Sequence, residues 1–142
     1  MTVVLGLLAG VGLALLSIAS TRYNCARLRP HPVDALELER LAWAAYLSLA
    51  ALIYIGFALR EAGDGWMGVE LLGLVGYTAL AVIGARRPVV LALGWGMHAG
   101  WDIIIHAGVP GEFVPQWYRW ACLSFDVVAA AYLVSRASGR SR

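Results

Sequence analysis

The sequence predicts an all-α polytopic membrane protein, with about five transmembrane helices that form a single bundle domain over residues 1–142. Hydrophobic residues make up 61% of the chain and charged residues 14%, whereas soluble domains are near half apolar and a quarter charged. Five apolar stretches approach the roughly 20 residues that cross a hydrocarbon core about 30 Å thick. The arginines collect between alternate stretches, as expected of loops on one side of a membrane.

The expected spans are residues 3–20, 41–59, 66–85, 89–107 and 117–135. The breaks between them carry the proline and glycine residues that end helices. These breaks are Arg29-Pro30-His31-Pro32, Gly63-Asp64-Gly65, Arg86-Arg87-Pro88, and Gly108-Val109-Pro110-Gly111 with Pro115.

The first span has two interpretations. Ser17-Ile18-Ala19 resembles the small-residue site at which a signal peptide is cleaved. However, no basic residue precedes the apolar run, and an arginine cluster follows it. This charge order favours a retained helix that starts outside, with a cleaved signal peptide as the alternative.

Residues 23–40 form the one sizeable polar stretch. We expect a cytoplasmic connector with an interfacial helical turn, in which Asp34 or a neighbour caps the second helix.

The arginine distribution predicts an N-terminus outside and a C-terminus in the cytoplasm. Only Arg60 and Arg119 then fall on the outer side, and Trp66 and Trp117 lie where outer-interface anchors belong. The cytoplasmic side receives the other nine: Arg22, Arg27, Arg29, Arg40, Arg86, Arg87, Arg136, Arg140 and Arg142.

The expected location is a bacterial cytoplasmic membrane, because the chain has no lysine and is rich in Ala, Gly and Val, as products of GC-rich bacterial genomes are. The expected partner is the lipid bilayer. A net charge of +2 is too small and too scattered to indicate nucleic-acid binding.

Five ionisable side chains lie in or near the predicted spans, where each is costly unless it is paired: Glu70, His98, Asp102, His106 and Asp126. His98, Asp102 and His106 recur at every fourth residue and therefore share one slightly slanting helix face. Counting from the helix ends places His98 level with Asp126, and Glu70 near the level of Asp102.

Three further side chains are expected to support this cluster. Tyr77 shares a helix face with Glu70, and Glu61 ends the second span near His106, which we expect at the outer rim. The indole of Trp101 lies next to Asp102 in the chain.

Imidazole and carboxylate groups together are ligands for zinc, iron or manganese. The stripe from His98 to His106 spans about 12 Å, so its three members cannot bind one ion. The expected ligand sets are His98, Asp102 and Asp126, or Asp102, His106 and Glu70. An ion held in this way would activate water for hydrolysis of a lipid-like substrate.

Two other interpretations stay open. The same residues without metal would pass protons in a small carrier or a proton-coupled transport component. They would otherwise bond only to one another and to the indoles of Trp95 and Trp101, in a membrane scaffold with no chemistry. The sequence assigns neither catalytic residues nor a substrate.

Two glycine pairs predict close helix contacts, because small residues four apart let helices approach. Gly96 and Gly100 lie opposite the polar face of the fourth span and predict a tight packing face within the bundle. Gly6 and Gly10 predict a dimer face, and hence a homo-oligomer.

The segment Met97-His98-Ala99-Gly100-Trp101-Asp102 contains H-x-x-W-D, and His106, Trp120-Ala121-Cys122 and Asp126 follow it. It resembles a family of small bacterial integral membrane proteins known as a domain of unknown function. The resemblance extends over nearly the whole chain in length and helix layout, and it implies no particular reaction.

Overall fold

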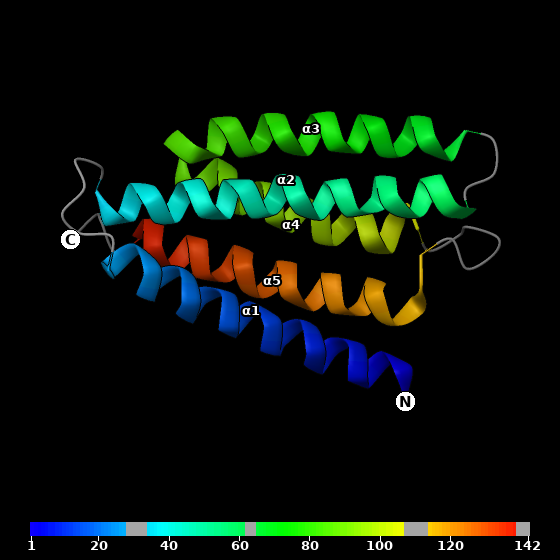
Figure 1. The fold of residues 1–142 in the computed structure, drawn as a ribbon, viewed down its shortest axis with the longest axis horizontal. Coiled ribbons are helices and arrows are strands. Elements are labelled where there is room, and N and C mark those ends of the chain that lie inside the picture. Colours follow the sequence, from blue (N-terminus) through cyan, green and yellow to red (C-terminus); the bar gives the residue numbers. More distant parts are fainter. Residues whose placement is uncertain (28–33, 62–64, 107–113, 139–142) are drawn as a thin grey trace.

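The computed structural model describes residues 1–27, 34–61, 65–106 and 114–138, and within these ranges the protein is entirely helical (Figure 1). The five helices are α1 (Thr2–Arg27), α2 (Ala35–Glu61), α3 (Trp66–Arg86), α4 (Pro88–Ile104) and α5 (Gln116–Ser138). The all-α prediction and the approximate position of every helix are confirmed.

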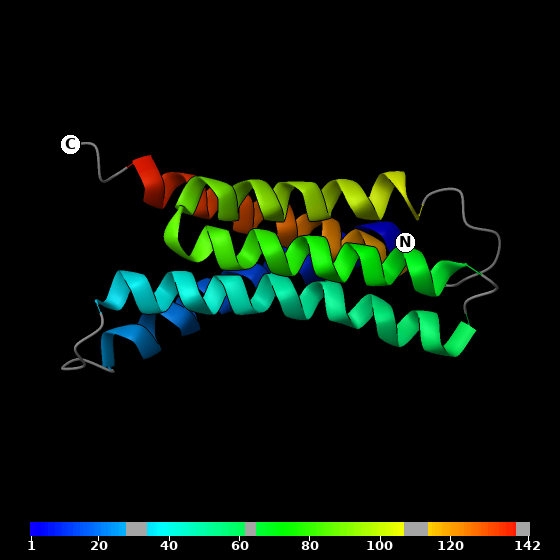
Figure 2. The ribbon, with the colours of Figure 1, turned by 90° about the horizontal axis from the view of Figure 1, so that it is seen from above.

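The helices lie along one long axis, and the start of α1 and the end of α5 lie at opposite ends of the bundle (Figures 1 and 2). Helix α5 packs against both α1 and α4, while α2 packs chiefly on α3. Helix α1 makes many contacts with α5 and few with α2. The first helix is therefore attached to the bundle mainly through the last.

Four of the described helices are long and apolar enough to cross a membrane: α1, α2 up to Arg60, α3 and α5. Helix α4 has only 17 residues, or about 26 Å at 1.5 Å per residue. The predicted fourth span, residues 89–107, was too long, because α4 ends at Ile104 and residues 107–113 lie outside the described part. The prediction of five spanning helices is thus supported for four.

The predicted connector at residues 23–40 is largely wrong. Its first residues complete α1, which continues to Arg27, and its last residues form the start of α2. Asp34 caps α2 as expected, because its Oδ1 accepts a hydrogen bond from the backbone N–H of Leu36 at 3.3 Å. The proline-containing break between the two helices lies outside the described residues.

The structure shows what the two predicted glycine faces contact. A Cβ atom at Gly10 would lie 2.0 Å from the carbonyl oxygen of Ala121, and one at Gly6 would lie 2.6 Å from that of Trp117. This glycine face packs on α5 within the chain, whereas the homo-oligomer that was expected through it stays a prediction. No atom of the described residues lies within 4 Å of a Cβ built at Gly96, so the predicted packing face of α4 is wrong.

The helix α4 glycine that does allow close packing is Gly94. A Cβ there would lie 2.8 Å from Cδ2 of Leu47 on α2. Leu47 belongs to the main apolar core, where the indoles of Trp43 and Trp95 meet edge to face with ring centres 5.8 Å apart. This core fixes α2, α4 and α5 relative to one another and so positions the polar residues that follow on α4.

Candidate metal centre

Three buried side chains meet between α4 and α5. His98 and Asp102 lie one turn apart on the same face of α4, and Asp126 faces them from α5; all three are at most 2% exposed. One ligand atom from each lies within 4.8 Å of a ligand atom of the other two. We call these residues the triad, and they are the first of the two expected ligand sets.

The triad is only partly hydrogen-bonded. Nδ1 of His98 donates to Oδ2 of Asp126 at 2.7 Å, and the hydroxyl of Tyr54 donates to Oδ1 of Asp102. Among the residues that the structure describes, His98 Nε2, Asp102 Oδ2 and Asp126 Oδ1 are buried without a hydrogen-bond partner. Leaving a polar atom buried and unpaired costs roughly 1–3 kcal/mol.

Three such atoms on one cluster fit a bound cation. In a four-coordinate site with bonds of about 2.0–2.2 Å, ligand atoms lie roughly 3.3 Å apart, so side chains within 4.8 Å need only small movements to share an ion.

Tyr54 is the member of the site that the sequence did not identify. It comes from α2, is 1% exposed, and its ring stacks on that of His106 with centres 4.7 Å apart. Its ring also meets that of His98 edge to face at 5.7 Å. A phenol within a long apolar helix requires a partner for its hydroxyl, but sequence alone does not say which carboxylate provides it.

A second buried pair lies beside the triad. Nε2 of His106 donates to Oε1 of Glu70 at 2.8 Å, and both side chains are at most 2% exposed. His106 follows the end of α4 at Ile104, and its side chain is nevertheless buried in the bundle. The structure does not bring Asp102 into one ligand group with these two residues, since the described part of the chain holds one such group, the triad. Glu61 ends α2, and its side chain falls outside what the structure describes.

Tyr77 and Trp101, the two other expected supporting residues, pack around the triad and the neighbouring pair. The hydroxyl of Tyr77 donates to the carbonyl oxygen of Met97 at 3.1 Å, and its ring meets that of His98 edge to face at 4.8 Å. The ring of Trp101 lies edge-on to Tyr77 at 5.8 Å and covers Gly73, where a Cβ would be 3.0 Å away. The indole nitrogen of Trp95 has no hydrogen-bond partner in the described residues, contrary to the scaffold interpretation.

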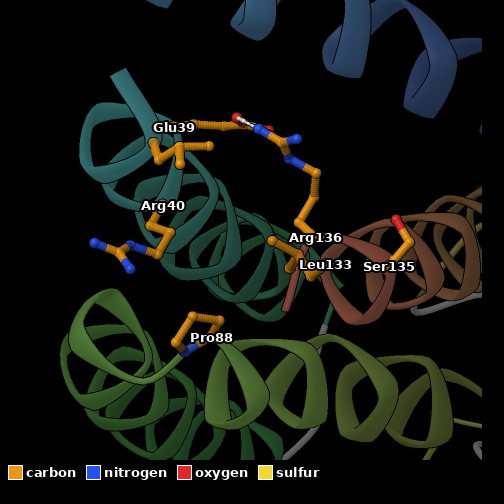
Figure 3. Close-up of a pocket in the computed structure, with 7 residues that line it drawn as sticks. Glu39, Arg40, Pro88, Leu133, Ser135 and Arg136 are labelled. Carbon is orange, nitrogen blue, oxygen red and sulfur yellow. Dashed lines mark hydrogen bonds and ion pairs between the residues drawn. The ribbon is translucent and has the colours of Figure 1, made fainter. Parts of the chain in front are cut away.

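A further polar cluster lies at the opposite end of the bundle (Figure 3). Glu39 of α2 is 6% exposed, accepts the hydroxyl proton of Tyr132, and pairs with Arg136 at 3.1 Å. A cavity of about 170 Å³ adjoins it. Arg136 reaches across this cavity to Glu39, so the cluster ties the end of α5 to the start of α2. The sequence analysis had placed Glu39 in the connector and missed this role.

Residues 8–140 match the model of a family of unknown function, DUF6010. The chain belongs to the DUF6010 family. The match includes the triad and the pair of His106 with Glu70, and it agrees with the resemblance to a family of unknown function. No curated protein and no solved structure matches this DUF6010 chain.

Proposed function

We propose that this DUF6010 protein is an integral membrane protein that binds one divalent transition metal ion through His98, Asp102 and Asp126. The observation that carries the proposal is one compact buried group of an imidazole and two carboxylates, each of which also has one polar atom without a partner in the described residues. One imidazole and two carboxylates suit zinc, iron or manganese.

The membrane part of the proposal is supported by the helix surfaces. Large apolar side chains face outward on several helices, including Leu16, which is 68% exposed, and Leu72, which is 73% exposed. Such surfaces are stable against lipid, and four helices have the length to cross it. The arginine distribution then places the N-terminus outside and the triad in the outer half of a cytoplasmic membrane.

The chemistry available to such a site is hydrolysis. An ion with three protein ligands keeps a position open for water and lowers the pKa of that water to about 7. Asp126 orients His98, and Tyr54 holds Asp102, so the protein fixes two of the three ligands before an ion arrives. The substrate we assign to this chemistry is lipid-like, because the site lies among helices that face the hydrocarbon core.

A second candidate is proton-coupled transport. Tyr54 connects the triad with the pair of His106 and Glu70, because its ring stacks on that of His106 and its hydroxyl donates to Asp102. Ionisable groups therefore follow one another from Glu70 to Asp126, as they do in proton relays of pumps and transporters. This arrangement needs no metal, so metal content separates the two candidates.

The test is elemental analysis of protein purified without chelator in lipid nanodiscs. We expect about one transition metal ion per chain, as one compact three-ligand group provides one site. His98→Gln and Asp126→Asn should lose the ion while keeping the helical content. The matched controls His106→Gln and Glu70→Gln should retain it, because these residues lie outside the triad.

Asp102→Asn separates binding from a purely structural role. If the cluster only joins helices, the amide should be tolerated or even stabilising, because it removes a charge that is costly to bury. If Asp102 is a ligand, metal should be lost at unchanged fold. Metal-free wild-type protein after growth with added zinc, iron and manganese would refute the metal site and leave the proton path.

A further inference from the structure

An apolar cavity of about 330 Å³ borders the triad on the side away from α3. Its walls come from α1, α2, α4 and α5, and nearly all of its lining side chains are hydrocarbon or aromatic. Trp95 and Asp126, each 1% exposed, form part of the lining. The cavity is therefore an apolar space that reaches one carboxylate of the triad.

The cavity opens through the side of the bundle. Four of its lining residues are also well exposed on the outer surface: Leu13 at 59%, Leu49 at 54%, Ile53 at 40% and Trp117 at 53%. They belong to α1, α2 and α5. Because α1 makes few contacts with α2, the opening lies between these two helices. In a membrane this side faces lipid.

The shape of the cavity indicates which kind of molecule can bind in it. It extends along α1 from Ala9 to Ser17, which is about 12 Å at 1.5 Å per residue. Its innermost walls include Trp95 and Asp126, each only 1% exposed. A helix about 10 Å across that lay over the mouth would not contact such recessed side chains, whereas a single hydrocarbon chain is narrow enough to reach them.

We propose that this cavity binds one hydrocarbon chain of a single-chain amphiphile that enters sideways from the bilayer. The inference rests on the proposed function, since it gives the substrate class of the metal site. Trp117 lies at the start of α5, at the level where interfacial tryptophans meet lipid headgroups. The amphiphile therefore enters near Trp117, and its polar group must reach Asp126 for the proposed hydrolysis, with its hydrocarbon chain lying along α1.

The experiment uses the full chain in nanodiscs with a palmitic acid analogue that carries a diazirine in its chain. After illumination, peptide mapping locates the adducts. We expect labelling of Trp95 or Asp126, which bulk lipid does not reach, and suppression of that labelling by excess palmitic acid. Labelling of outward residues such as Leu72 should not be suppressed, because they meet any lipid.

A matched pair of substitutions tests the location. Ala9→Phe should fill the cavity and abolish the competed labelling, since Ala9 is an exposed residue on the cavity wall. Ala19→Phe is the control, because Ala19 is an exposed residue of the same helix outside the cavity lining. Both variants should keep their metal content.

The outcomes separate the two proposals. Labelling confined to outward residues, or competed labelling unchanged in Ala9→Phe, would overturn the chain-binding inference whatever the metal content. Competed labelling of the cavity in protein that contains no metal would support chain binding and refute the metal site. Crosslinking of a second copy across the cavity mouth, without labelling inside, would also overturn the inference.

Discussion

The contact between α1 and α5 at Gly10 allows a sharp prediction about the fold. In Gly10→Ala, the new Cβ would lie 2.0 Å from the carbonyl oxygen of Ala121 and 2.1 Å from Oγ of Ser124. Ordinary contact begins near 3.4 Å, so α1 must move outward by more than 1 Å. Backbone atoms cannot give way as a flexible side chain would.

The expected cost has two parts. Overpacking of a tight interface costs about 1–3 kcal/mol. The shift also lengthens the hydrogen bond that Ser124 donates to the carbonyl oxygen of Leu7, now 2.9 Å, and such interhelical bonds contribute about 0.6 kcal/mol in membranes. The higher helix propensity of alanine offsets up to about 1 kcal/mol of this cost, so we expect Gly10→Ala to lower the free energy of unfolding by about 1–3 kcal/mol.

The assay is reversible unfolding in mixed micelles titrated with a denaturing detergent. Gly12→Ala is the matched control, because a Cβ there would have no atom within 4 Å among the residues that the structure describes. Alanine also favours the helix over glycine by up to about 1 kcal/mol. The control should be neutral or stabilised. If Gly10→Ala proved as stable as Gly12→Ala, the described packing of α1 on α5 would be wrong.

Two further predictions concern the orientation of the chain and the end of the bundle that holds Glu39. A reporter active only in the cytoplasm should work when fused after Arg142 and fail when fused at Gly111, and activity at Gly111 would reverse the orientation. Glu39→Ala should lower the free energy of unfolding by about 1–2 kcal/mol, because the partly buried hydroxyl of Tyr132 loses its acceptor. The side chain of Arg136 is 39% exposed and adds little, since water can solvate it. Exposed Glu37→Ala should cost under about 1 kcal/mol, and equal losses for both would refute the proposed tie.

The helices and the level of His98 with Asp126 could be predicted from the sequence, because apolar length and rise per residue depend on local chemistry alone. Helix ends were less predictable. Helix α1 continues to Arg27 through polar residues, since a helix need not stop where the hydrocarbon core stops. The prediction from Gly96 failed for a related reason, because glycine spacing indicates that a close contact is sterically allowed but not which face receives a partner.

The site was predictable in its members on one helix and less so across helices. The four-residue spacing placed His98 and Asp102 on one face of α4. Tyr54 and the pairing of Glu70 with His106 depend on the rotation of α2 and α3 about their axes, which apolar residues on all sides do not encode. The contacts of Glu39 with Tyr132 and Arg136 could not be predicted for the same reason.

X-ray absorption of the zinc-loaded protein tests the central claim most directly, because it reports the atoms around the ion. The triad predicts a shell of nitrogen and oxygen only, at about 2.0–2.2 Å, with the scattering signature of one imidazole. That signature should disappear in His98→Gln and persist in His106→Gln. A sulfur atom near 2.3 Å, or a spectrum unaffected by His98→Gln, would contradict the assignment of the metal to this triad.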